Sequence, residues 1–124
     1  LSLLEKTNSK ALYVTPSHQF PTGVTMPISN RLKLINWAKN NNTFIIEDDY
    51  DSELSYYNRP IPSLQGLDNS DQIIYLGTLS KALSPALRIS YIVLPTQLLN
   101  LYHQIFDFRF SGVPIDIQKT LTLF

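Results

Sequence analysis

The sequence contains no cysteine and has no excess of charge of either sign. The lack of cysteine excludes disulfides, thiolate nucleophiles and zinc–thiolate sites, and no metal site is predicted. Ten basic and ten acidic residues give a formal charge of zero, so the chain has no general attraction for nucleic acid or acidic membranes. Any DNA binding would therefore need a part of the protein outside this chain.

Long hydrophobic runs are also missing. No apolar run approaches the roughly 18 residues that a membrane helix needs. Residues 1–5 are too short and too soon charged to form a signal peptide. The sequence thus predicts a soluble, cytoplasmic protein that makes no membrane contact.

The length and the two ends of the sequence indicate a piece of a larger domain. With 124 residues, 44% of them hydrophobic, the chain can bury only a modest core. No methionine stands at position 1, and residues 115–124 look like a helix whose apolar pattern is still running at the last residue. We therefore expect a fragment.

The first half of the chain shows a strand, loop, helix, strand pattern. Residues 11–14 and 43–46 are short apolar runs typical of buried strands, and the turn formers of 16–23 follow the first run. The apolar face of the intervening helix is predicted to contain Ile28, Leu32, Ile35 and Ala38. Pro27 begins this helix with Ser29 near its cap, Arg31 lies off the apolar face, and three asparagines end it. This pattern indicates parallel neighbours in an α/β sheet.

The second half adds two strands and a helix. Residues 51–71 indicate an irregular surface segment, and 73–76 a third strand. A fourth strand at 89–94 follows too closely for a crossover helix, so it should run antiparallel to the third. Apolar residues repeat at helical spacing over 98–108 and predict a helix, which Ser-Gly-Val-Pro at 111–114 breaks.

Polar residues follow each of the three parallel strands. In parallel sheets, the working groups lie at the carboxyl ends of strands. The loop 16–23, the acids and tyrosine of 48–50, and residues 78–81 should therefore meet at one crevice if the strands are neighbours. Lys81 stands out because it follows small polar residues directly after an apolar strand. Each member also has a structural interpretation: lysines usually lie at the surface, and acids can simply end a strand.

These residue types match the chemistry of pyridoxal phosphate. A Schiff-base lysine needs a deprotonated amine, and the cofactor also needs an acid at its pyridine nitrogen and donors for its phosphate. Lys81 and Asp48 could meet the first two needs. Hydroxyl and guanidinium donors for the phosphate are offered by Thr78, Ser80 and Arg88.

Three motifs carry a family resemblance. The motifs are Thr78-Leu79-Ser80-Lys81 with Arg88, Glu47-Asp48-Asp49-Tyr50-Asp51-Ser52-Glu53, and Thr15-Pro16-Ser17-His18-Gln19-Phe20-Pro21-Thr22-Gly23. From about residue 13 to 95 the chain resembles fold-type I pyridoxal-phosphate transferases. It is most similar to the aminotransferase-like domain of MocR-type regulators of the GntR superfamily.

The resemblance implies a role for each site residue. Lys81 would carry the cofactor as an aldimine, Asp48 would pair with the pyridinium nitrogen, and Tyr50 would hydrogen-bond the phenolic oxygen. The phosphate would be held by Thr78, Ser80 and Arg88. Aminotransferases have an asparagine at the position of Phe20, whereas a phenylalanine at this position is itself like the regulators. The resemblance assigns no role to His18 or Gln19.

The resemblance also implies what the chain does not contain. Residues 1–124 would be part of the large domain, without the upstream phosphate loop and stacking aromatic, the winged-helix DNA-binding domain or the C-terminal small domain. We expect this piece alone to bind pyridoxal phosphate poorly and to turn over no substrate. The full-length protein should be a homodimer, since the family's cofactor site lies at a subunit interface.

Two functions remain open, beside a third interpretation in which the lysine is structural. In the first, the domain senses an amino compound or pyridoxal phosphate and changes DNA binding by an attached winged helix. In the second, it belongs to a stand-alone aminotransferase. The residues of the three motifs are closer to those of the regulators and favour the first function.

Overall fold

Four strands form one sheet in the order β1-β2-β3-β4. The computed structural model describes residues 3–51, 61–106 and 111–123. The strands are β1 (Ala11–Val14), β2 (Phe44–Asp49), β3 (Ile73–Thr78) and β4 (Ser90–Val93). The first three are mutually parallel, and β4 is antiparallel to β3. The predicted α/β class, the neighbouring parallel strands and the antiparallel fourth strand are all confirmed.

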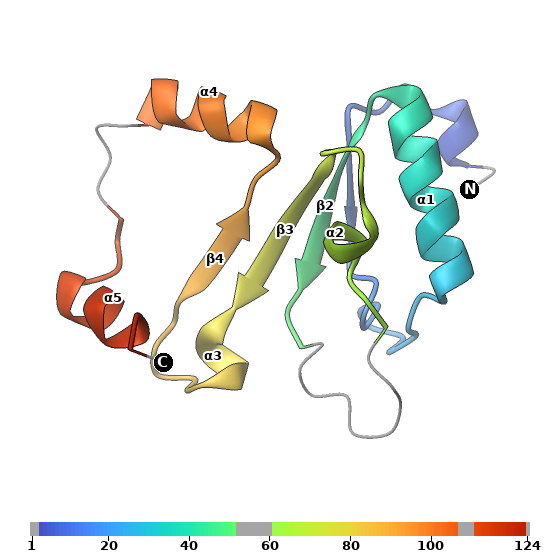
Figure 1. Cartoon of the computed structure of the whole chain (residues 1–124). Helices are drawn as coiled ribbons and strands as arrows, with labels where there is room; N and C mark the ends of the chain where they lie inside the picture. The colour runs from blue at the N-terminus through green and yellow to red at the C-terminus, as the bar shows by residue number, and fades with distance from the viewer. Residues whose placement is uncertain (1–2, 52–60, 107–110, 124) are drawn as a thin grey trace.

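A short 3-10 helix precedes β1, and α-helices occur after each of the four strands. They are η1 (Leu4–Lys6), α1 (Ile28–Asn41), α2 (Leu64–Leu67), α3 (Leu79–Ala82), α4 (Thr96–Phe106) and α5 (Ile115–Leu121). Figure 1 shows β1 and β4 at the two edges of the sheet, with α4 and α5 beyond β4 and far from α1. Among the described residues, no helix is both long and apolar enough to cross a lipid bilayer.

The core lies between α1, α2 and one face of the sheet. Its buried members are Leu34, Ile35, Ala38, Ile45, Leu64 and Ile73. Ile45 and Leu64 are fully buried, and burial of such a side chain contributes about 1.5–3 kcal/mol. This face is called the helix face below, and the opposite one the open face.

The predicted apolar face of α1 is wrong in part. Ile35 and Ala38 are buried, but Ile28 and Leu32 are 44% and 45% exposed. Arg31 is fully buried instead, because its side chain bonds three backbone carbonyl groups. The helix ends as predicted at the asparagines, with Asn42 in the left-handed conformation at φ 50°. Ser29 does not cap it, since Pro27 is the N-cap residue and forms no side-chain cap bond.

Several predicted boundaries also change. The three acids at 47–49 lie inside β2 rather than after it, because they continue its pairing with β3. The segment 61–67, expected to be irregular, contains α2, and Lys81 lies on α3 rather than in a loop. The rest of the predicted irregular segment, at 52–60 with Tyr56 and Tyr57, and the predicted helical Phe108 lie outside the described residues.

Candidate functional site

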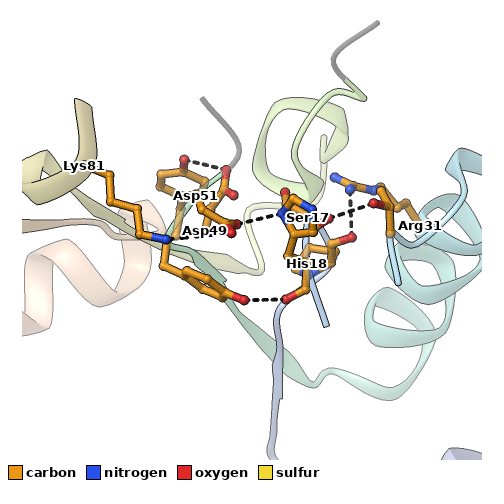
Figure 2. Close-up of polar contacts among 10 residues, drawn as sticks. Ser17, His18, Arg31, Asp49, Asp51 and Lys81 are labelled. Atoms are coloured by element: carbon orange, nitrogen blue, oxygen red, sulfur yellow. Dashed lines mark hydrogen bonds and ion pairs between the residues drawn. The ribbon is translucent and has the colours of Figure 1, made fainter. Parts of the chain in front are cut away.

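The carboxyl ends of β1, β2 and β3 meet at one edge of the sheet. Val14 pairs with Glu47, and Asp49 pairs with Gly77, so the segments that follow the three strands leave the sheet together. This places the 16–23 loop, Tyr50 and Lys81 in one region, as the sequence predicts. Figure 2 shows Lys81 extending toward Asp51, with His18 on the other side of that carboxylate.

Strand alternation separates the two aspartates of β2. Asp49 is 7% exposed on the helix face, where it accepts a 2.9 Å hydrogen bond from the Tyr75 hydroxyl. Burial and this carboxylate raise the pKa of Tyr75. Asp48 points to the open face and is half-buried. Of the two, Asp48 alone is therefore placed to meet a ligand on the open face.

Tyr13 on β1 reaches Asp48 across the open face. Its hydroxyl donates a hydrogen bond to Asp48 Oδ2. This bond, with lesser contributions from burial and from the charges of Asp48 and Tyr50, raises the pKa of Tyr13 to about 12. Tyr13 is not among the site residues predicted from the sequence. Its position just before the end of β1 was a possible signal, but only the register of β1 on β2 shows the contact.

Tyr50 follows β2 and lies between the lysine and the 16–23 loop. Its hydroxyl donates a 2.9 Å hydrogen bond to the backbone carbonyl of His18. The amine of Lys81 lies 4.9 Å from the centroid of the Tyr50 ring, within the range of a cation–π contact. Burial, followed by the charges of Asp51 and Asp48, raises the pKa of Tyr50.

Lys81 also has a carboxylate neighbour that the sequence analysis did not single out. Lys81 Nζ lies 3.8 Å from Asp51 Oδ2, and the lysine side chain is 42% exposed. The other carboxylate oxygen of Asp51 accepts a 3.0 Å hydrogen bond from His18 Nδ1. The lysine therefore lies at an accessible position, with an aromatic face and a negative charge beside it.

The predicted phosphate donors surround the start of α3. Thr78 is the N-cap residue: its hydroxyl accepts from the Ser80 backbone N–H at 3.2 Å and donates to the Ile89 carbonyl at 3.2 Å. Arg88 immediately precedes Ile89 and has a left-handed backbone, with φ of 50°. Its side chain is exposed and forms no ion pair among the described residues. The structure thus brings Thr78 and Ser80 together, and Arg88 directly precedes Ile89, whose carbonyl accepts the bond from Thr78.

Two buried charged residues support the site from the helix face. Glu47 accepts hydrogen bonds at 2.8 and 2.9 Å from the backbone N–H groups of Leu64 and Gln65, so it fixes α2 to β2. Burial raises the pKa of Glu47, although these bonds and Arg31 oppose the rise. This explains why an acid occupies a fully buried position in the middle of a strand.

Arg31 holds the segments around the site together. It donates to the carbonyl oxygens of Met26, Pro62 and Pro16 at 3.1, 2.9 and 3.0 Å. Figure 2 shows its guanidinium directed at the chain that carries Ser17 and His18. Burial lowers the pKa of Arg31, while Glu47 and Asp49 counteract the effect. The start of the 16–23 loop is therefore fixed by a buried cation.

The donor set suits a phosphorylated aldehyde with a basic ring nitrogen. An accessible primary amine, an open-face carboxylate and a tyrosine hydroxyl lie at neighbouring strand ends. Thr78 at the end of β3 and Ser80 just after it carry hydroxyl groups, and the exposed guanidinium of Arg88 follows. The residues that the structure describes therefore fit the pyridoxal phosphate that the sequence motifs imply.

Comparison with known proteins agrees with this geometry. Residues 2–114 match the family model of aminotransferase class I and II. The HTH-type transcriptional regulator YdeL of Bacillus subtilis is 51% identical over 113 residues, which is 91% of this chain and 24% of YdeL. The probable rhizopine catabolism regulatory protein MocR of Rhizobium meliloti is 47% identical over 89 residues, 72% of this chain and 18% of MocR.

A solved enzyme structure has the same fold. LysN, an α-aminoadipate aminotransferase from Thermus thermophilus, was solved with N-(5'-phosphopyridoxyl)-L-leucine. It matches with a TM-score of 0.74 and 33% identity, over 83% of this chain and 27% of LysN. The chain thus spans about a quarter or less of each of these three relatives. It belongs to the aminotransferase class I and II family, and its resemblance to the aminotransferase-like domain of MocR-type regulators is confirmed.

Proposed function

We propose that this chain is part of a pyridoxal-phosphate-binding, effector-sensing domain of a DNA-binding transcriptional regulator. The observation that carries the proposal is the position of Lys81. Its amine lies 4.9 Å from the centroid of the Tyr50 ring, and Tyr50 directly follows β2, the strand that carries Asp48. The family match and the two regulators described above support it. Bound pyridoxal phosphate would supply an aldehyde that condenses with amines and a ring that withdraws electrons.

Each predicted site residue has a role in this proposal. Lys81 holds the cofactor covalently as an aldimine, and Asp48 holds the pyridine nitrogen. Tyr50 hydrogen-bonds the phenolic oxygen. To do so, its hydroxyl must share or give up the hydrogen bond that it donates to the His18 carbonyl. Thr78, Ser80 and Arg88 hold the phosphate, with the guanidinium free to offer two parallel N–H groups.

The rest of the proposed assembly lies outside residues 1–124. A winged-helix domain binds DNA, a C-terminal small domain completes the effector site, and the full-length cytoplasmic protein is a homodimer. The effector is a small amino compound or pyridoxal phosphate itself. Phe20, at the position where aminotransferases carry an asparagine, favours the regulator, because its side chain cannot hydrogen-bond a phenolic oxygen.

The cofactor assignment is tested by absorbance of the full-length protein. Addition of pyridoxal phosphate should produce the visible band of an aldimine in the wild type and in the control Lys33→Ala, which changes an exposed lysine on α1. The band should be lost in Lys81→Ala. A band that persists in Lys81→Ala would refute the assignment.

A stand-alone aminotransferase is the second candidate, favoured by the match to the enzyme LysN. The two candidates differ in what an amino compound does to the loaded protein. The regulator should change its affinity for its target DNA and release no keto acid. Steady release of keto acid, with no change in DNA binding, would favour the enzyme.

A further inference from the structure

Asp51 bridges two parts of the site that are distant in sequence. Its Oδ1 atom accepts a hydrogen bond from His18 Nδ1 at 3.0 Å, and its Oδ2 atom lies 3.8 Å from Lys81 Nζ. The Asp51 side chain is 16% exposed, against 39% for His18 and 42% for Lys81. The carboxylate is thus the least accessible member of the three and lies between the other two (Figure 2).

Tyr50 and Asp51 hold the same two partners by different contacts. Tyr50 donates to the backbone carbonyl of His18 and presents its ring to Lys81. Asp51 accepts from the imidazole of His18 and lies within ion-pair distance of the lysine amine. The dipeptide that follows β2 therefore connects the 16–23 loop to the lysine through two adjacent side chains.

We propose that Asp51 is a positioning residue for Lys81, and that His18 fixes the orientation of its carboxylate. An amine held in an ion pair must leave that contact before it can attack a carbonyl carbon. Asp51 therefore holds the amine of the unmodified lysine beside the Tyr50 ring. The hydrogen bond from His18 leaves the second carboxylate oxygen facing the lysine.

This inference rests on the proposed function of Lys81 but is tested without pyridoxal phosphate. Full-length protein is treated with a limiting amount of an amine-acetylating reagent at one fixed pH, and mass spectrometry gives the acetylation rate of each lysine. Asp51→Asn should raise the rate at Lys81 about threefold, the effect expected when a partly exposed ion pair is removed. Lys33 and Lys39 serve as internal controls and should keep their rates.

Two further variants separate positioning from a general loosening of the fold. Asp51→Glu keeps the charge and should restore a rate at Lys81 below that of Asp51→Asn. His18→Ala should raise the rate at Lys81 when Asp51 is present and change nothing in the Asp51→Asn background. Equal rates in wild type and Asp51→Asn would overturn the proposal, as would an effect of His18→Ala that is the same in both backgrounds. If the wild-type protein forms no cofactor band but the acetylation rates change as predicted for the Asp51 and His18 variants, the result would count against the proposed function alone.

Discussion

Tyr13, on the edge strand β1, donates its hydroxyl hydrogen to the carboxylate of Asp48 on the neighbouring strand β2. The bond lies on the open face, the face not covered by α1 and α2. It orients the acid that we propose to hold the pyridine nitrogen. A hydroxyl donor also stabilises the negative charge that this acid needs in order to pair with a protonated ring.

The first prediction concerns the titration of Tyr13. Its pKa is raised to about 12, chiefly by the hydrogen bond to Asp48, from the ordinary value of 10.0. Asp48→Asn should return the titration of Tyr13 toward the ordinary value, whereas Asp116→Asn on α5 should not. The measurement is tyrosinate absorbance, taken as the difference between protein with and without Tyr13→Phe in each background. Because the folded pKa is raised, the contact stabilises the fold fully below pH about 10 and loses this effect as the pH rises through about 12.

The second prediction concerns Arg31. Arg31→Ala removes three hydrogen bonds from a buried guanidinium. The Met26 and Pro62 carbonyls lose this donor, whereas the Pro16 carbonyl keeps its 2.8 Å bond from the Met26 N–H. We expect it to lower the free energy of unfolding by about 3–5 kcal/mol. Arg31→Lys should lose most of the same stability, because one ammonium cannot reach all three carbonyls.

Urea denaturation of the full-length protein measures these changes. Lys33→Ala, an exposed substitution in the same helix, should stay within about 0.5 kcal/mol of wild type. An Arg31→Ala protein as stable as Lys33→Ala would contradict the assignment of Arg31 as the residue that fixes the 16–23 loop.

The third prediction concerns Gly77, which pairs with Tyr91 across β3 and β4. A Cβ atom at this glycine would overlap the Tyr91 ring, so Gly77→Ala forces the ring to move. The expected loss is about 1–3 kcal/mol in urea denaturation. The loss should shrink when Tyr91→Ala is also present. Gly112→Ala is the matched control, because its Cβ would meet no atom within 4 Å. A similar loss of stability in Gly112→Ala would show that steric contact with Tyr91 is not the cause.

The fourth prediction concerns Glu47. Glu47→Ala leaves the N–H groups of Leu64 and Gln65 without their acceptor, and should cost about 2–4 kcal/mol in urea denaturation. Burial raises the pKa of Glu47, so its ionisation opposes folding as the pH rises from the ordinary value through the folded one. Glu47→Gln does not ionise and should lack this component of the pH dependence. An identical pH profile in wild type and Glu47→Gln would show that Glu47 does not ionise across that range.

The order of elements could be predicted because it depends on local patterns. The apolar runs ending at Val14 and Leu76 mark strands, and the short link before Ile89 leaves no room for a crossover helix. The prediction that the first of these strands is buried is wrong, because β1 lies at the sheet edge and its residues are exposed or half-buried. These features predicted the parallel strands, the antiparallel β4 and the meeting of the strand ends. The candidate residues Lys81 and Tyr50 came close together for the same reason.

The remaining features depend on contacts between distant segments. Arg31 is buried only because carbonyls of Pro16 and Pro62, 15 and 31 residues away in sequence, converge on it. Likewise, Asp51 meets a histidine 33 residues earlier. Charge and helical periodicity placed Arg31 on the solvent side of α1, since neither reveals which acceptors the folded chain brings together.

The central claim is that Lys81 is the residue that bonds pyridoxal phosphate. The direct measurement is borohydride reduction of the full-length protein incubated with pyridoxal phosphate, followed by proteolysis and mass spectrometry. The phosphopyridoxyl group should be found on Lys81 in the wild type and in Lys33→Ala, and nowhere at comparable yield in Lys81→Ala. Label spread equally over exposed lysines such as Lys33 and Lys39, or wild-type protein without label on Lys81, would contradict the claim.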